Sequence, residues 1–139
     1  MKRPKIWFRD SGVLHALLGL RSHDEVLVHP RLGASWEGFA LEEVLRLYEA
    51  SDEDAYFWAV HQQIELDLFL MRRGKRHGFE FKYGDAPTMT KSLATARDLL
   101  ALDALTVVCP GDADYALGDR VRARGLESLI DESRRDGWE

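Results

Sequence analysis

The sequence is poor in the groups that build disulfides, thiolate metal sites and membrane spans. It has one cysteine, Cys109, which lies in the apolar run 105–109, so a disulfide framework and a cysteine-ligated metal are both excluded. We expect Cys109 to be a small core residue. No apolar stretch approaches the roughly 20 residues that cross a bilayer, and no signal-type apolar core follows the basic start. The sequence therefore predicts a cytoplasmic protein without a membrane partner.

An excess of positive charge is also lacking. The chain has 19 Lys and Arg against 24 Asp and Glu, a net charge of -5, whereas proteins that bind nucleic acid usually present a basic surface. A cation site would account for part of the acidity, and some cations are concentrated in one turn. We predict that this turn contacts phosphates, the alternative being a solvated turn; its residues are Arg72, Arg73, Lys75 and Arg76.

Length and composition indicate one globular domain. With 139 residues, of which 45% are hydrophobic and 31% charged, the chain can bury a single core without needing disulfides or a structural metal ion. We predict one domain over 1–139, with a core at 5–131 and a polar tail at 132–139.

Apolar periodicity predicts the order of the elements. A short helix after Asp10 ends at Gly19, and a linker follows at 20–33. A longer helix then buries one face, and one of its acids, Glu37, is expected to point toward the core. A helix at 89–102 that feeds a buried strand predicts a parallel crossover. The predicted elements after the linker are helix 35–50 with inner residues Trp36, Phe39, Ala40, Val44, Leu47 and Tyr48, strands 55–60, 64–70 and 78–83, helix 89–102 with inner residues Met89, Leu93, Ala96, Leu99 and Leu100, strands 104–109, 115–117 and 121–123, and helix 126–134.

The segments 64–70 and 78–83 are the most informative part of the chain. If their turn centres between Arg73 and Gly74, residues whose numbers sum to 147 face each other. Asp67 then lies opposite Glu80, and Glu65 opposite Lys82, while Leu66, Leu68, Phe79 and Phe81 take the other face. Opposed like charges are destabilising, so this arrangement predicts a bound cation. The alternative is an exposed hairpin whose acids and lysine simply form its solvent-facing side.

Aromatic and histidine residues flank the hairpin. The strand with Tyr56, Phe57 and Trp58 could stack bases, but an aromatic strand beside a core is usually core. His61 and His77 lie at the hairpin ends, where they either touch phosphate or metal or are plain turn residues.

The order helix, three strands, helix, strand, with Glu37 followed by Asp67 and then Glu80-Phe81-Lys82, resembles the PD-(D/E)xK nuclease superfamily. More narrowly, the chain is similar to a domain of unknown function found at the C-terminus of bacterial and archaeal AAA-type ATPases. That similarity rests on four motifs over residues 5–131: the run 7–12, the segment 33–39 and the triplets 65–67 and 80–82. It implies an α/β fold with a restriction-endonuclease-like mixed sheet (α-β-β-β-α-β) flanked by helices.

The resemblance also implies a Mg²⁺- or Mn²⁺-dependent nuclease. Asp67 and Glu80 would be direct ligands, Lys82 would orient water or offset developing charge, and Glu37 would be an outer or second-metal acid. Glu65 would hold Lys82 or add a ligand. The alternatives are a first-turn acid for Glu37 and a plain ion pair for Glu65 with Lys82.

No GxxxxGK[ST] loop is present, so the chain has no ATPase module of its own. A second hypothesis is therefore a nuclease-shaped module of weak or lost activity. It would bind a partner ATPase, a second copy as a homodimer, or nucleic acid.

Overall fold

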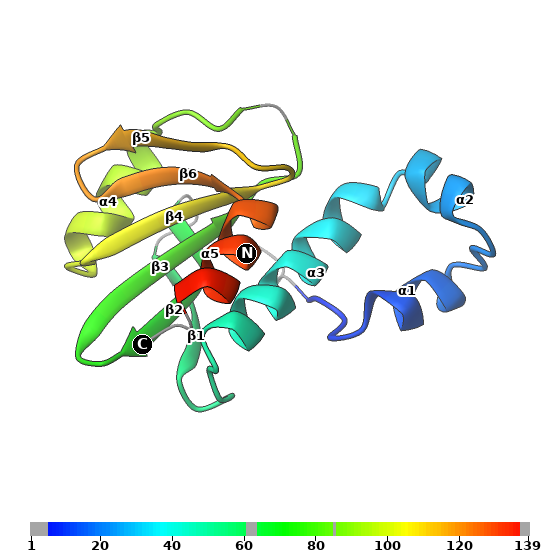
Figure 1. The fold of residues 1–139 in the computed structure, drawn as a ribbon, viewed down its shortest axis with the longest axis horizontal. Coiled ribbons are helices and arrows are strands. Elements are labelled where there is room, and N and C mark those ends of the chain that lie inside the picture. The colour runs from blue at the N-terminus through cyan, green and yellow to red at the C-terminus, as the bar shows by residue number, and fades with distance from the viewer. Residues whose placement is uncertain (1–5, 61–63, 85, 137–139) are drawn as a thin grey trace.

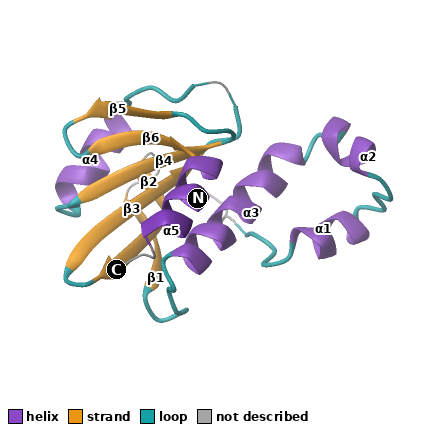
Figure 2. Ribbon diagram, viewed as in Figure 1, coloured by secondary structure: helices purple, strands orange, loops and turns teal. Residues whose placement is uncertain are grey.

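The computed structural model describes residues 6–60, 64–84 and 86–136. The predicted turn at 61–63, with His61, lies outside these residues, as do 1–5, 85 and 137–139. A mixed sheet is packed between helices (Figures 1 and 2). The elements in chain order are α1 (Ser11–Leu17), α2 (His23–Val28), α3 (Leu32–Leu47), β1 (Ala55–Val60), β2 (Ile64–Arg72), β3 (Lys75–Phe81), α4 (Lys91–Leu99), β4 (Ala104–Cys109), β5 (Asp114–Gly118), β6 (Val121–Gly125) and α5 (Leu126–Asp136).

The six strands lie in the order β1-β2-β3-β4-β6-β5. β1, β2 and β3 are antiparallel neighbours, whereas β3 with β4 and β4 with β6 are parallel. The crossover from β3 through α4 to β4 is therefore parallel, as predicted. The predicted fold class, an α/β fold with a mixed sheet flanked by helices, is confirmed.

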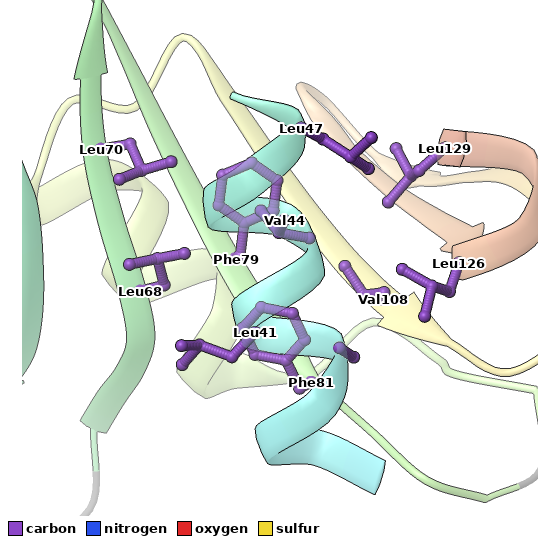
Figure 3. Packing of buried hydrophobic residues seen from close by; sticks show 11 residues of the cluster. Leu41, Val44, Leu47, Leu68, Leu70, Phe79, Phe81, Val108, Leu126 and Leu129 are labelled. Atoms are coloured by element: carbon purple, nitrogen blue, oxygen red, sulfur yellow. The ribbon is translucent and has the colours of Figure 1, made fainter. Parts of the chain in front are cut away.

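The larger core lies between the sheet and the pair α3 and α5. Val44 and Leu47 of α3 pack with Phe79 of β3, and Leu129 comes from α5 (Figure 3). Burying large side chains of this kind is worth about 1.5–3 kcal/mol each. This face holds α3 in a fixed place along β2 and β3.

The smaller core lies on the other face of the sheet, under α4. Leu93 of α4 packs with Leu66, Leu102 and Leu105. A Cβ atom at Gly78 would come within 2.6 Å of a Leu102 methyl and 3.0 Å of a Leu66 methyl. Only glycine lets these leucines approach β3 so closely.

The β2–β3 turn is the one that the sequence predicted. Arg72 pairs with Lys75, and the pairs continue to Leu68 with Phe79, so every pair sums to 147. Arg73 and Gly74 both have positive φ, 50° and 75°, the conformation of a two-residue hairpin turn. The predicted register of the hairpin, and with it the assignment of β3 side chains to the two faces of the sheet, is therefore confirmed.

The region before α3 differs from the prediction. The expected linker at 20–33 contains α2, because Ser22 accepts a hydrogen bond from the Glu25 amide and so caps a helix. α3 begins at Leu32 rather than 35, and it ends at Leu47 because Glu49 adopts a φ of 49°.

Several residues expected on inner faces are exposed. Phe39 of α3 and Leu99 at the end of α4 lie outside the cores. α4 is also shorter than predicted, because it starts at Lys91 after the Thr90 cap and ends at Leu99. Tyr56 and Phe57 are also exposed, because β1 is an edge strand. The core expectation was thus wrong for these two aromatics, while Trp58 does pack against the smaller core.

Candidate functional site

A bulge in β2 sets the geometry of the candidate site. Tyr56 of β1 pairs with Phe69, whereas Trp58 pairs with Leu66, so Asp67 and Leu68 together face one β1 residue. The extra residue reverses the alternation. Leu66 therefore joins the core under α4 and Leu68 the core under α3, and the prediction that both share a face was wrong.

Asp67 lies at this bulge and is 2% exposed. Its Oδ2 accepts a hydrogen bond from the backbone amide of Phe81 at 3.0 Å. The paired residues of β2 and β3 end at Leu68 and Phe79. The carboxylate therefore accepts a hydrogen bond from an amide that lies just beyond the last pair. Buried polar groups need such partners, and this bond places Asp67 beside the residue between Glu80 and Lys82.

Glu80 and Lys82 project from the end of β3. Phe79 and Phe81 face α3, so alternation turns Glu80 toward the α4 side. The Lys82 Nζ lies 3.8 Å from Glu80 Oε1. The Lys82 side chain is 55% exposed and that of Glu80 only 16%, so the lysine is the more accessible member of the pair.

Glu37 stands near the same end of β3. The ring of the preceding residue, Trp36, lies 5.8 Å from that of Tyr83, two residues beyond β3. Leu41, one helical turn after Glu37, belongs to the same core as Phe81 (Figure 3). Glu37 is partly buried. That its side chain lies close to Asp67 stays a prediction.

Glu65 is brought toward β1. It pairs with Ala59 and is partly buried. The described ladder between β2 and β3 stops before Glu65, so its predicted position opposite Lys82 also stays a prediction.

The basic turn lies at the other end of the hairpin. Arg72 is five residues from Asp67 along β2, roughly 16 Å at a strand's rise per residue. Its guanidinium stacks 5.6 Å from the centre of the Tyr48 ring and its side chain is 19% exposed. The Arg76 amide donates to Asp103, and its guanidinium to the Leu100 carbonyl. Arg73, Lys75 and Arg76 are the exposed cations of this turn.

His77 lies on the α3 side of the sheet. Its ring lies edge-on to Tyr48 at 5.6 Å, and burial lowers its pKa while Asp103 opposes that shift. Burial also raises the pKa of Tyr48 to about 12. Since alternation puts Glu80 on the other face, His77 and Glu80 lie on opposite sides of the sheet.

The number of neighbouring ligand side chains limits the kind of metal site that the described residues can form. Over 6–60, 64–84 and 86–136, no group of three or more His, Cys, Asp or Glu side chains is close enough to hold an ion. A closed four-ligand site of the structural zinc type therefore does not fit. A hard ion that keeps several waters needs only one or two carboxylates.

Sequence reasoning missed the bulge and the Asp67–Phe81 bond. The available signal was an acid between two leucines in an otherwise apolar strand, since a buried carboxylate must find donors. It also missed the pairing of Arg72 with Tyr48, for which the pattern offered no signal.

Comparison with known proteins places the chain in a family. Among the described residues no helix is both long and apolar enough to span a bilayer. The chain is 39% identical over 129 residues to an uncharacterized protein of Mycobacterium tuberculosis, Rv2008c, and equally to one of Mycobacterium bovis, Mb2031c. These matches cover 93% of this chain but only 29% of each relative. A family model matches residues 32–129, from the start of α3 into α5, so the chain belongs to the family described as a domain of unknown function, DUF4143.

Proposed function

We propose that this domain is a divalent-metal-dependent phosphodiesterase that acts on nucleic acid, with its site at the open end of the β2–β3 hairpin. One observation carries the proposal: the carboxylate of Asp67 is bonded to the residue between Glu80 and Lys82. Asp67 therefore lies beside the end of β3 that carries Glu80 and Lys82, and this arrangement supports a shared site. The order α3, β1, β2, β3, α4, β4 is also the order on which the PD-(D/E)xK resemblance rests.

Mg²⁺ or Mn²⁺ would be held by Asp67 and Glu80. Asp67 Oδ2 accepts a hydrogen bond from the Phe81 amide, which would hold the carboxylate in a fixed orientation toward the ion. Water and a substrate phosphate would complete the shell. The ion, when bound, polarises a phosphoryl oxygen and lowers the pKa of a water.

Lys82 supplies the positive charge for the reacting phosphate. Its ammonium is exposed and only 3.8 Å from Glu80, so it can swing from the acid to a phosphoryl oxygen. There it would offset the negative charge that develops in the transition state. Glu37, at the same end of β3, would orient water in the ion's outer shell, while Glu65 is the auxiliary acid.

Substrate contact outside the site would involve the basic turn. Arg73, Lys75 and Arg76 are exposed and offer charge to a phosphate backbone. Because the turn is roughly 16 Å from Asp67, it would contact a different phosphate from the one cleaved. Arg72, which stacks on Tyr48, would support the turn.

A second candidate function is a nuclease-shaped binding module without chemistry. It is favoured by the near-complete burial of Asp67 and its bond to the backbone, which is also what a purely structural acid would show. Such a module would bind a partner ATPase, a second copy or nucleic acid.

Metal binding and cleavage, measured separately, distinguish the two functions. Under the proposal, calorimetric titration with Mn²⁺ shows a site in the wild type that is lost in Glu80→Gln, and labelled DNA and RNA are cleaved only with metal. A matched control is Glu127→Gln, an exposed acid on α5. No Mn²⁺ binding at Glu80, together with no cleavage, would leave only the binding module.

A further inference from the structure

α1 and α2 contribute no buried residue to either core. Both contact α3, and they lie to one side of the molecule, away from the sheet (Figure 1). Thirteen large hydrophobic side chains are exposed among the described residues, and seven of them fall within 6–28. Leu17 is 69% exposed and Val28 83%. An apolar concentration of this kind marks an interaction surface.

A pocket gives this surface a place for an anchoring side chain. It has a volume of about 240 Å³ and lies between α1, the segment before it and the first turns of α3. Its wall is mostly apolar and includes Trp7, Phe8, Leu14 and Leu18. Fully desolvated anchors in such pockets dominate the affinity of protein interfaces.

The surface is held in a fixed geometry. Asp10 accepts hydrogen bonds from the Gly12 and Val13 amides and so caps α1. His15 Nε2 lies 2.6 Å from the hydroxyl of Ser35, a buried residue of α3. A surface arranged in advance loses less conformational entropy on binding.

Charge indicates what kind of molecule covers the surface. Residues 6–31 hold three arginines and three acids, so the segment has no net charge apart from its histidines. A nucleic acid or an anionic lipid would select a cationic surface. A neutral apolar surface with a pocket fits a folded protein instead.

The relatives indicate which protein that is. The family model begins at Leu32, so α1 and α2 lie outside the matched domain. The mycobacterial relatives match 129 of the 139 residues, and hence more than half of segment 6–28. The matched stretch of these relatives therefore includes much of the segment that forms α1 and α2 here, inside chains of which most lies outside the match.

We propose that α1, α2 and the pocket between α1 and α3 are the docking surface for a second folded domain, of the kind that makes up the unmatched part of these relatives. The proposal is independent of the phosphodiesterase site, which lies at the end of β3. It states where a companion domain binds, whatever the chemistry of either domain.

Hydrogen exchange on two whole proteins tests the docking surface. The 139-residue chain is compared with the full-length Mycobacterium tuberculosis relative. We expect the amides that match residues 11–28 to exchange at least about tenfold more slowly in the longer protein, because a domain covers them there. Equal exchange of this segment in the two proteins would overturn the proposal.

Substitutions supply an independent readout. Leu17→Asp and Val28→Asp should leave the melting temperature of the isolated chain unchanged, whereas the matching changes should lower that of the full-length relative. Leu99→Asp, at an exposed position on α4, is the matched control and should change neither. A dimer of the isolated chain that Leu17→Asp dissociates would assign the surface to a second copy and overturn the proposal.

Discussion

The Asp67 carboxylate accepts a hydrogen bond from the Phe81 amide at 3.0 Å, across the gap where β2 and β3 cease to pair. The bond joins the two strands at their open end and fixes the position of one acid of the candidate site. Fold stability and site geometry therefore depend on the same side chain.

Replacement of Asp67 should show this dependence. Asp67→Ala leaves a buried amide without its partner, and we expect it to lower the free energy of unfolding by about 1–3 kcal/mol. Asp67→Asn keeps an acceptor oxygen and should retain most of the stability. Urea denaturation measures both. Equal stability of the alanine and asparagine variants would show that the hydrogen bond contributes nothing.

The β2–β3 turn should be sensitive at Gly74. Its φ of 75° is costly for a residue with a Cβ atom, by about 1–2 kcal/mol. We expect Gly74→Ala to shift the urea midpoint downward accordingly. Gly84→Ala is the control, because no atom lies within 4 Å of its added Cβ and its φ is unremarkable. If both variants unfold at the wild-type midpoint, the turn does not hold Gly74 in the left-handed region.

Two other glycines should respond in opposite directions. A Cβ at Gly78 would meet leucine methyls at 2.6 and 3.0 Å, so Gly78→Ala should destabilise by about 1–3 kcal/mol. Gly33 lies within α3, where the nearest atom to a Cβ is a Tyr83 carbon at 3.7 Å. Gly33→Ala should therefore stabilise by about 0.5–1 kcal/mol. Thermal melts give the two signs, and a stable Gly78→Ala protein would contradict the packing described for α4.

His77 should make stability depend on pH. Burial lowers its pKa below the ordinary value of 6.5, so the unfolded chain takes up the proton more readily than the folded one. The contribution of neutral His77 to the free energy of unfolding is fully present above pH 6.5, and it is lost as the pH falls toward the lower pKa of the folded state. His77→Gln should flatten this part of the curve. If the melting temperatures of the wild type and the variant change in parallel between pH 7 and 5, this linkage is ruled out.

Much of the sheet was predictable because strand and turn patterns are local. The 2-residue turn at Arg73 and Gly74 fixed the register of the hairpin, and the unalternating run 104–109 indicated the buried parallel strand. The exposure of Tyr56 and Phe57 was not predictable, since it depends on β1 being at the sheet edge. A sequence pattern does not tell an edge strand from a central one.

The candidate site was predictable in its residue types but not in its geometry. An acid between leucines and the Glu80-Phe81-Lys82 triplet drew attention to β2 and β3, which are paired neighbours in the sheet. The bulge that separates the faces of Leu66 and Leu68 arises from pairing with β1, which is a long-range effect. For the same reason, periodicity placed Glu37 on the inner side of α3 but gave no distance to Asp67.

Mn²⁺-dependent cleavage by Lys82→Ala tests the proposed function most directly. Lys82 is exposed and is not an expected metal ligand, so the variant should fold, bind Mn²⁺ like the wild type and lose all cleavage of labelled DNA and RNA. Lys91→Ala, an exposed lysine at the start of α4, should cleave at the wild-type rate. The account is contradicted if Lys82→Ala cleaves as fast as the wild type, or if the wild type cleaves no faster than Asp67→Ala.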